Sequence, residues 1–385
     1  MRVHGLSLSA AVATGDGAVS RMKRSSAATT AAASAGETVG GTAIASLGRR
    51  FIFLCVLAGR APNEGYRRAV PQIPVLDHDA VLAAVEPAAA IEHVRDAFVR
   101  HHRGEWTMPA KVYLPCPPAG DFRAMPARGG DLALLKWICS FPGAAATGQP
   151  TVAGVVCLSD ARDGRPLMLL DARAVTALRT GASAAVAAAA LARDDARSVG
   201  IVGCGLHGAW AARCLVAAGY SDGVCVDAQR DAAVALADEL SWEAAPDRAA
   251  ALRCDVVCCV TPGAEPVVEV GDLHAGVHLN MLGADGPGKA EATIAAVASC
   301  QLFCDEWEQA SHGGELAGAI AAGAIDRGAV GELGAVLCGD APGRAGADAV
   351  TLFDSTGLAI QDLAIARAAL EAWRDGRVGA QTVRL

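Results

Sequence analysis

A glycine-rich segment followed by an acidic residue is the first pattern in this sequence with a clear chemical use. Residues 198–208 read SVGIVGCGLHG: the apolar run GIV leads into Gly203, Gly205 and Gly208, and a helical run, AWAARCLVAAG, follows. Glycines at this spacing let the backbone turn tightly and approach a pyrophosphate, which then lies at the helix N-terminus. A second apolar run, GVCVDA, ends at Asp227, close to the expected spacing of ~20 residues for a carboxylate that holds the adenosine ribose hydroxyls. The pattern predicts a dinucleotide site that prefers NAD to NADP; the alternative is a glycine-rich turn beside an ordinary surface aspartate.

The composition limits the classes of protein to be considered. The chain has 385 residues, of which 52% are hydrophobic and 19% charged, with a net charge of −8. This apolar content can bury a large core and excludes a wholly disordered or fibrous protein. The acidic balance argues against a nucleic-acid partner, since phosphate binding needs clustered Lys and Arg, and the 4% of aromatic residues is too low for base-stacking platforms.

Thirteen cysteines could suggest disulfides or zinc, but their spacing does not. None forms a Cys-x-x-Cys pair, and several fall in apolar runs such as CDVVCCVT at residues 254–261. Cysteine in such a run behaves as a small buried hydrophobe. We therefore expect reduced, structural thiols in a cytoplasmic protein, against the alternatives of a disulfide or a zinc site.

Residues 1–68 differ in composition from the rest. They are rich in Ala, Ser, Thr, Gly and Arg and contain only Asp16, Glu37 and Glu64 as acids, which is typical of an organelle transit peptide. The alternatives are a start codon assigned too far upstream and a disordered tail. The apolar run at 51–58 is too short to span a bilayer, which takes about 20 residues. We expect a disordered, dispensable leader and no membrane partner.

The elements that would position the glycine-rich loop follow from periodicity. Apolar residues at helical spacing predict helices over 81–101, and an Ala-rich run predicts a helix over 174–192 with Asp171 as its N-cap. Between them, the runs MPAKVYL, DFRAMPA, LALLKWICS and TVAGVVCLS are typical of strands. Beyond residue 198, apolar runs alternate with helical stretches, which predicts an α/β fold with a doubly wound parallel sheet of Rossmann type.

Several long motifs together resemble one known family. MPAKVYL, GDFRAMPA, LLKW, LDARAVTALRTGA, GCGLHG, LNMLGADGPGK, EQASHGGEL and FDSTGLAIQD occur in this order in the ornithine cyclodeaminase/mu-crystallin family, with the closest likeness to its archaeal-type alanine dehydrogenase branch. The resemblance covers about residues 75–385. It implies a homodimer in which a Rossmann domain at 186–351 is inserted in a discontinuous α+β substrate and dimerisation domain at 70–185 plus 352–385. It also implies nicotinamide-dependent chemistry at Cα of a small amino acid or its imine.

The same resemblance assigns the catalytic residues. Lys136 in LLKW resembles the family's catalytic lysine, and apolar neighbours would lower its pKa and suit it to proton exchange with an amine. Asp285 in GADGPGK resembles the acidic catalytic residue that pairs with the amine or guides a water. The alternatives are a surface lysine and an aspartate that merely forms a turn.

Substrate and cofactor residues carry over in the same way. Arg179 in ALRTG resembles the arginine that holds the substrate carboxylate near the cofactor, as its planar fork suits, and Lys111 would be a second anion-binding group. Arg123 stands where the cyclodeaminase branch has an acid, and it would repel the distal ammonium of ornithine. Its alternative is a side chain that points to solvent. Cofactor contacts are expected from Thr151, Arg179, Thr180, Gly203, Gly205, Leu206, His207, Gly208, Asp227, Thr261, Lys289 and Ser355, with Leu206 and His207 acting through backbone amides. His274 and His312 lack metal-ligand spacing, so no metal is expected.

Two departures from the family pattern concern the substrate pocket and the fingerprint. Cys139-Ser140-Phe141-Pro142 replaces an Asn-x-His-Pro stretch that many relatives have, and Gly208 replaces the usual Ala. The resemblance favours an NAD-dependent amino-acid dehydrogenase or imine reductase. The alternatives are an ornithine cyclodeaminase that releases ammonia to give proline, a ketimine or pyrroline-2-carboxylate reductase, and a mu-crystallin-like binding protein.

Overall fold

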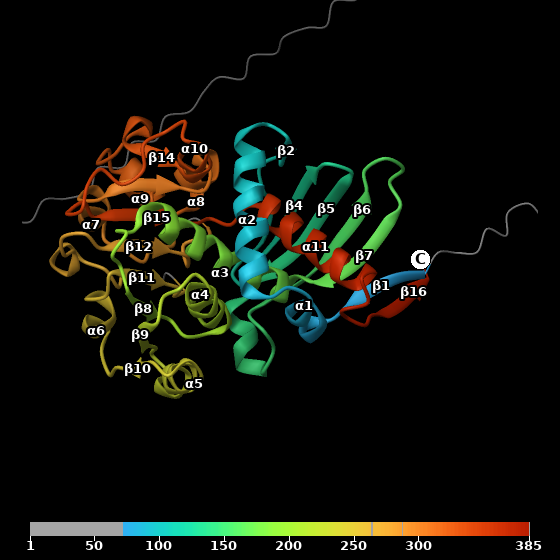
Figure 1. Cartoon of the computed structure of the whole chain (residues 1–385), viewed down its shortest axis with the longest axis horizontal. Coiled ribbons are helices and arrows are strands. Elements are labelled where there is room, and N and C mark those ends of the chain that lie inside the picture. The colour runs from blue at the N-terminus through green and yellow to red at the C-terminus, as the bar shows by residue number, and fades with distance from the viewer. Residues whose placement is uncertain (1–71, 263–264, 287, 385) are drawn as a thin grey trace, which may run out of the picture. The chain divides into compact units, whose positions relative to one another are not determined.

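The computed structural model describes residues 72–262, 265–286 and 288–384; the leader expected at 1–68 lies outside them, so that expectation stays untested. The described residues form two eight-stranded sheets with associated helices (Figure 1). One sheet is mixed and the other is entirely parallel. The expected α/β class with a Rossmann-type parallel sheet is therefore confirmed.

The mixed sheet is formed by both ends of the described chain. Its order is β16-β1-β7-β6-β5-β4-β2, with β3 also paired to β4. The C-terminal strand β16 pairs antiparallel with β1, which is how residues more than 300 positions apart share one sheet. The strands are β1 (Gln72–Leu76), β2 (Trp106–Thr107), β3 (Val112–Cys116), β4 (Gly120–Gly129), β5 (Leu132–Ser140), β6 (Val152–Asp160), β7 (Pro166–Asp171) and β16 (Gln381–Arg384).

The parallel sheet is doubly wound. Its order is β10-β9-β8-β11-β12-β15-β13-β14, so the chain leaves β8 first toward one edge and then returns to build the other. In such sheets, ligands bind at the carboxyl ends of the strands where the order reverses, here beside β8 and β11. The strands are β8 (Ser198–Val202), β9 (Asp222–Val226), β10 (Glu243–Ala244), β11 (Val256–Cys259), β12 (His278–Met281), β13 (Gln301–Cys304), β14 (Val330–Glu332) and β15 (Thr351–Asp354). The domain boundary expected at residue 352 falls inside β15, which belongs to this sheet; the domain limits otherwise remain a prediction.

The longest helix, α3 (Ala172–Leu191), is the central packing element. Asp171 caps it by accepting a hydrogen bond from the Ala174 N–H at 2.7 Å, as expected, and the helix therefore begins at Ala172 rather than at Ala174. It is the one helix among the described residues that is long and apolar enough to span a membrane. Nearly all its residues are buried, and it packs against α2, α4 and α11, so it is a core helix.

The other helices fall into two groups. Helix α1 ends at Ala84 and α2 begins at Pro87, where the missing N–H of proline costs no hydrogen bond, so the helical run expected over 81–101 is two helices. The helices associated with the mixed sheet are α1 (His78–Ala84), α2 (Pro87–His102), the 3₁₀ turn η2 (Pro142–Thr147) and α11 (Ala359–Arg374). Those within the parallel-sheet segment are α4 (Leu206–Ala217), α5 (Arg230–Leu240), α6 (Arg248–Leu252), η3 (Val270–Asp272), α7 (Ile294–Ala298), α8 (Trp307–Gly313), α9 (Ala317–Ala321), η4 (Arg327–Ala329) and α10 (Leu333–Cys338).

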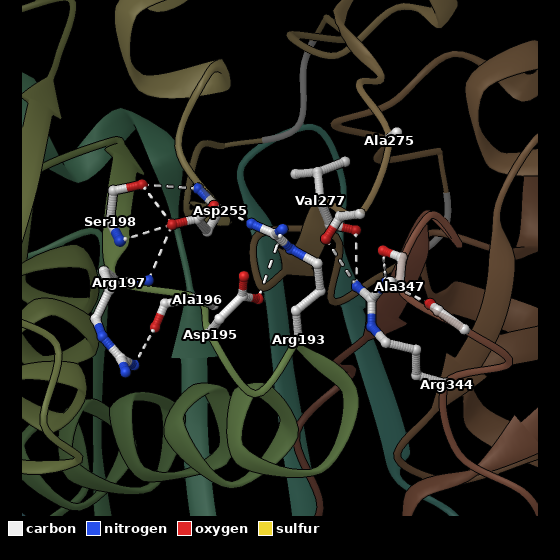
Figure 2. A network of polar contacts seen from close by, with 12 residues as sticks. Arg193, Asp195, Ala196, Arg197, Ser198, Asp255, Ala275, Val277, Arg344 and Ala347 are labelled. Carbon is white, nitrogen blue, oxygen red and sulfur yellow. Dashed lines mark hydrogen bonds and ion pairs between the residues drawn. The ribbon is translucent and has the colours of Figure 1, made fainter.

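A polar network fixes the amino ends of the parallel strands (Figure 2). Asp255, just before β11, accepts hydrogen bonds from the backbone N–H groups of Arg197 and Ser198. It also forms an ion pair with Arg193, whose Nη2 lies 2.5 Å from Asp255 Oδ1. These bonds lower the pKa of Asp255 to about 2, although its burial opposes the shift. Arg344 donates hydrogen bonds to the carbonyl oxygen of Gly276, before β12, and to that of Leu191, the last residue of α3. The network lies at the end of the sheet opposite the glycine-rich loop, so its contribution is to hold the strands in register.

Candidate active site

One cavity of about 660 Å³ collects most of the residues that the sequence singled out. Its wall includes loops at the carboxyl ends of β8, β11, β12 and β15, together with strands of the mixed sheet and α3. The expected site residues that line it are Lys111, Arg123, Lys136, Thr151, Arg179, Thr180, Gly205, Leu206, His207, Gly208, Thr261, Asp285, Lys289 and Ser355. Gly203 and Asp227 do not line it. Their roles, like those of the other assigned residues, remain predictions.

The glycine-rich loop has the shape that a dinucleotide fingerprint requires. Gly203 has φ of +100°, and a Cβ there would lie 2.5 Å from the Val260 carbonyl oxygen. A Cβ at Gly208 would lie 1.8 Å from the carbonyl oxygen of Gly203, so the start of α4 packs directly on the loop. Gly205 is the N-cap of α4 and provides no side-chain cap, and open space surrounds the place where its Cβ would be. The free N–H groups of the first turn are therefore available to an anion.

Asp227 follows β9 and contacts the glycine-rich loop. Its carboxylate accepts hydrogen bonds from the Cys204 N–H at 2.6 Å and from the Gln229 N–H at 2.7 Å. Each carboxylate oxygen has further acceptor capacity, and the side chain is half-buried beside the loop. Asp227 thus lies where a ribose-binding carboxylate is expected and also fixes the conformation of the loop.

Lys136 is buried because of the alternation of β5. Leu134, Lys136 and Ile138 face the covered side of the strand, and Lys136 is only 1% exposed. Its Nζ lies 2.8 and 2.7 Å from the two carboxylate oxygens of Asp362 on α11, and 3.4 Å from Thr176 Oγ1 on α3. Burial lowers the pKa of Lys136 to about 8, although the charge of Asp362 opposes the shift. An ammonium that titrates near neutrality can give or take a proton at physiological pH.

Two further cations of the cavity contact the loop after β15. Lys111 Nζ donates to the Thr356 carbonyl oxygen at 2.6 Å, and burial lowers the pKa of Lys111 to about 8. Gly357 has φ of +79°, and a Cβ there would lie 2.4 Å from Arg179 Nη1, so the guanidinium packs against bare backbone. Asp305 holds this loop by accepting bonds from Thr356 Oγ1 at 2.9 Å and from the Gly357 N–H at 2.8 Å.

Asp285 is bound on both sides by cations. Arg123 Nη1 and Lys289 Nζ each lie 2.6 Å from one of its carboxylate oxygens. Although burial opposes ionisation, the charges of Arg123, Lys289 and Lys111 lower the pKa of Asp285 well below its usual range. Arg123 is 7% exposed and also binds Asp121 at 2.6 Å, so the alternative that it points to solvent is wrong. Asp285 is therefore a carboxylate at neutral pH.

The histidines divide between the cavity and the surface. Burial lowers the pKa of His207 to about 4, which leaves a neutral imidazole at the cavity. His102, Cys338 and Asp340 place three ligand atoms within 4.8 Å of one another at the ends of α2 and α10. The expectation of no metal rested on other histidines and overlooked this group, whose His102 Nε2 lies 2.9 Å from Asp340 Oδ2. None of the three lines the cavity.

Sequence reasoning overlooked four residues that the fold brings to the site. Asp362 pairs with Lys136, and Arg173, Thr176 and Thr356 line the cavity. Asp362 and Thr356 belong to the motif FDSTGLAIQD, and Arg173 and Thr176 to LDARAVTALRTGA. The motifs indicated these segments, but nothing in their spacing indicated the pairing with Lys136.

The parallel sheet, its glycine-rich loop and the cationic cavity at its carboxyl edge define a Rossmann-type enzyme. Residues 75–377 match the model of the ornithine cyclodeaminase/mu-crystallin family, and the chain belongs to that family. It is 36% identical over 324 residues to alanine dehydrogenase of Archaeoglobus fulgidus, covering 80% of this chain and 97% of that one. It is also 36% identical over 222 residues to iminosuccinate reductase of Paracoccus denitrificans, covering 56% and 69% of the two chains.

Solved structures of similar proteins show the same family resemblance. An archaeal alanine dehydrogenase dimer with bound NAD superposes with a TM-score of 0.78 at 34% identity, covering 82% of this chain and 100% of that one. Thermococcus litoralis Δ1-pyrroline-2-carboxylate reductase, in complex with NADH and L-proline, superposes with a TM-score of 0.77 at 26% identity, covering 80% and 100%. The resemblance stated from the motifs is thereby confirmed.

Proposed function

We propose that this protein is an NAD-dependent oxidoreductase that acts on the Cα–N bond of a small L-amino acid or reduces the matching imine. One observation carries the proposal: the uncapped N-terminus of α4 and the buried ammonium of Lys136 line the same cavity. The first feature suits a dinucleotide pyrophosphate. The second suits proton exchange with an amine. The names of the relatives, alanine dehydrogenase and iminosuccinate reductase, belong to this reaction class.

The residues present fit the cofactor. Gly203 and Gly208 give the tight turn, Gly205 leaves open space at the start of α4, and Asp227 stands at the end of the second strand. A bound nicotinamide supplies the two-electron oxidation or reduction at Cα. The other proposed cofactor contacts come from Thr151, Thr180, Thr261, Lys289 and Ser355.

The remaining cations and Asp285 have proposed roles toward the substrate. Lys111 and Arg179 hold the α-carboxylate, since both are seated on the loop after β15 and face the cavity. Lys136 receives a proton from the substrate amine in oxidation and returns one in imine reduction. Asp285, as a carboxylate, orients the ammonium or the water that attacks the imine.

We further propose a cytoplasmic homodimer. Trp137 and Val155 face each other across β5 and β6, and Phe122 stacks on Trp137 at 5.3 Å. With Leu114 of β3, paired to Phe122, they form an apolar row across four strands, and its members Leu114, Trp137 and Val155 are 54, 38 and 42% exposed. A second copy of the chain would cover this surface. The twelve cysteines of the described residues are free thiols, in keeping with a reducing compartment.

NADH absorbance tests the proposed function directly. Oxidation of small L-amino acids with NAD, and reduction of 2-oxo acids with ammonium and NADH, should both change it. Lys136→Ala and Asp285→Ala should each lower kcat by about 10²–10⁴ and leave the Kd for NADH within a few-fold of wild type. Asp375→Ala, at the exposed end of α11, is the control. A variant at Lys136 or Asp285 with wild-type kcat removes that residue from the mechanism.

The alternatives give different products. Ornithine cyclodeamination would yield proline and ammonia at constant NADH, and a pyrroline-2-carboxylate reductase would consume NADH with the cyclic imine. A binding protein would bind NADH and turn over nothing. One panel of substrates followed by absorbance and amino-acid analysis separates all four.

A further inference from the structure

Arg173 is a cation of the cavity wall without a hydrogen-bond or ion-pair partner among the described residues. It is the second residue of α3, half-buried, and lines the cavity. It makes no hydrogen bond or ion pair with any residue that the structure describes. Its position is unfavourable for folding, because the positive end of the helix dipole lies at the N-terminus, where anions and not cations are stabilised. A half-buried arginine with these surroundings needs another reason to be there.

Four of the other five cations of the cavity make short contacts with described residues, whereas Nε of Arg179 has no hydrogen-bond partner among them. Lys111 donates to the Thr356 carbonyl oxygen, Lys136 pairs with Asp362, and Arg123 and Lys289 share Asp285. Arg179 Nε lies 3.7 Å from Asp362. Six cationic side chains thus line the cavity against one carboxylate, Asp285, in a chain whose net charge is −8. The excess of positive charge is therefore local to this wall.

The position of Arg173 relative to the catalytic lysine follows from helix geometry. Arg173, Thr176 and Thr180 lie at spacing i, i+3, i+7 and all line the cavity, so they share one face of α3. Thr176 Oγ1 lies 3.4 Å from Lys136 Nζ. Arg173 lies one turn further toward the start of the helix, and helical side chains lean in that direction. This spacing therefore places Arg173 one helical turn from the contact between Thr176 and Lys136, on the side away from Thr180.

We propose that Arg173 forms a second anion subsite that binds a side-chain carboxylate of the substrate, so that the physiological substrate is a dicarboxylic amino acid or its imine. This inference rests on the proposed function. Lys111 and Arg179 hold the α-carboxylate, and Arg173 holds the second carboxylate beyond the reacting carbon. The planar guanidinium binds a carboxylate through two parallel N–H bonds. In the reductive direction the C=N carbon gains a hydride and the nitrogen a proton, while NADH is oxidised to NAD.

The test compares substrates that differ by one carboxylate. NADH oxidation is measured with ammonium plus oxaloacetate or pyruvate for wild type, Arg173→Gln and the control Arg253→Gln, an exposed arginine outside the cavity. The wild type should prefer oxaloacetate by at least about tenfold in kcat/KM, since the half-buried guanidinium of Arg173 stays unpaired with pyruvate and is paired with the second carboxylate of oxaloacetate. Arg173→Gln should lose about tenfold or more with oxaloacetate, mainly through KM, and stay within about threefold with pyruvate. Arg253→Gln should change neither.

A binding measurement keeps the inference testable without turnover. Calorimetric titration of the NADH-bound enzyme with succinate and with propionate should show binding of succinate that Arg173→Gln removes. Equal kcat/KM for the two oxo acids, or succinate binding that survives Arg173→Gln, overturns the subsite. A higher KM for NADH in Arg173→Gln, with no change for oxaloacetate, would assign the guanidinium to a cofactor phosphate instead. Absent turnover with every amino acid and imine would overturn the proposed function, while the succinate titration would still decide the subsite.

Discussion

Lys136 and Asp362 form a buried ion pair although 226 positions separate them in the chain. Lys136 Nζ lies 2.7 Å from Asp362 Oδ2, and the two side chains are 1% and 0% exposed. The pair joins β5 to α11, and Arg179 on α3 stands 3.7 Å from the same carboxylate. Asp362 does not line the cavity, and its charge opposes the lowering of the Lys136 pKa that burial causes.

The first prediction concerns pH. Burial lowers the pKa of Lys136 to about 8, so the lysine loses its proton as the pH rises through that value. Imine reduction, which needs the protonated acid, should slow above about pH 8, and amino-acid oxidation, which needs the neutral base, should accelerate there. Asp362→Asn removes the charge that favours the ammonium and should move the inflection to lower pH.

Profiles of kcat/KM against pH in both directions measure this inflection. Asp375→Asn, on the exposed end of the same helix, is the control. The pKa of Lys111 is also about 8, but its opposing charges come from Asp285 and Asp305 and not from Asp362. An inflection that Asp362→Asn leaves in place therefore does not belong to Lys136.

The second prediction concerns the fingerprint loop. Gly203→Ala would place a methyl group 2.5 Å from the Val260 carbonyl oxygen at a residue with φ of +100°, so the loop must shift away from the cofactor. The Kd for NADH should rise by at least about tenfold, since such strain is of the order of 1–3 kcal/mol. Gly271→Ala, with nothing within 4 Å of the new Cβ, should leave the Kd unchanged. Fluorescence titration of NADH decides the question, and equal Kd values for the two variants would show that the loop tolerates a side chain.

The third prediction concerns the choice of cofactor. Asp227 would hold the ribose hydroxyls and repel a 2′-phosphate, so NADH should bind more tightly than NADPH. Asp227→Ser should bring the Kd values for NADH and NADPH closer together. It should also destabilise the loop, because the Asp227 carboxylate accepts a hydrogen bond from the Cys204 N–H. Arg230 lies nearby in sequence, at the start of α5, and Arg230→Ala tests whether it offsets the repulsion. A smaller Kd for NADPH than for NADH in the wild type would contradict the assignment.

The fourth prediction separates a dehydrogenase from a cyclodeaminase. The distal ammonium of ornithine needs an unpaired carboxylate, because a buried unpaired charge is costly. Asp285, the carboxylate among the residues that line the cavity, is engaged by Arg123 and Lys289 at 2.6 Å each. The guanidinium of Arg123 would also repel the ammonium. Incubation with ornithine and catalytic NAD should therefore produce negligible proline, and proline accumulating at constant NADH would favour the lyase.

Local sequence determined the elements and the segments of the site. The period-2 alternation of β5 buries Lys136, Asp171 caps α3, and the glycines between β8 and α4 give a turn that few other residues permit. These features depend on neighbours within a few residues, because strand alternation, helix capping and positive φ are properties of the local backbone. For this reason the Rossmann sheet and most cavity residues could be predicted.

Only the tertiary structure decided which groups meet. Asp362 contacts Lys136 because α11 packs on the mixed sheet. Arg123 contacts Asp285 although 162 positions separate them in the chain. Arg173 has no ion-pair partner among the described residues because the packing of strands and helices around it brings no carboxylate of this part of the chain into ion-pair distance. Such pairings are set by strand order, register and helix packing, and these place side chains together without any regular spacing along the chain. The apolar neighbours of Lys136 in the sequence indicated only that its pKa would be lowered, whereas the opposing charge of Asp362 and the cations around Asp285 follow from the tertiary contacts.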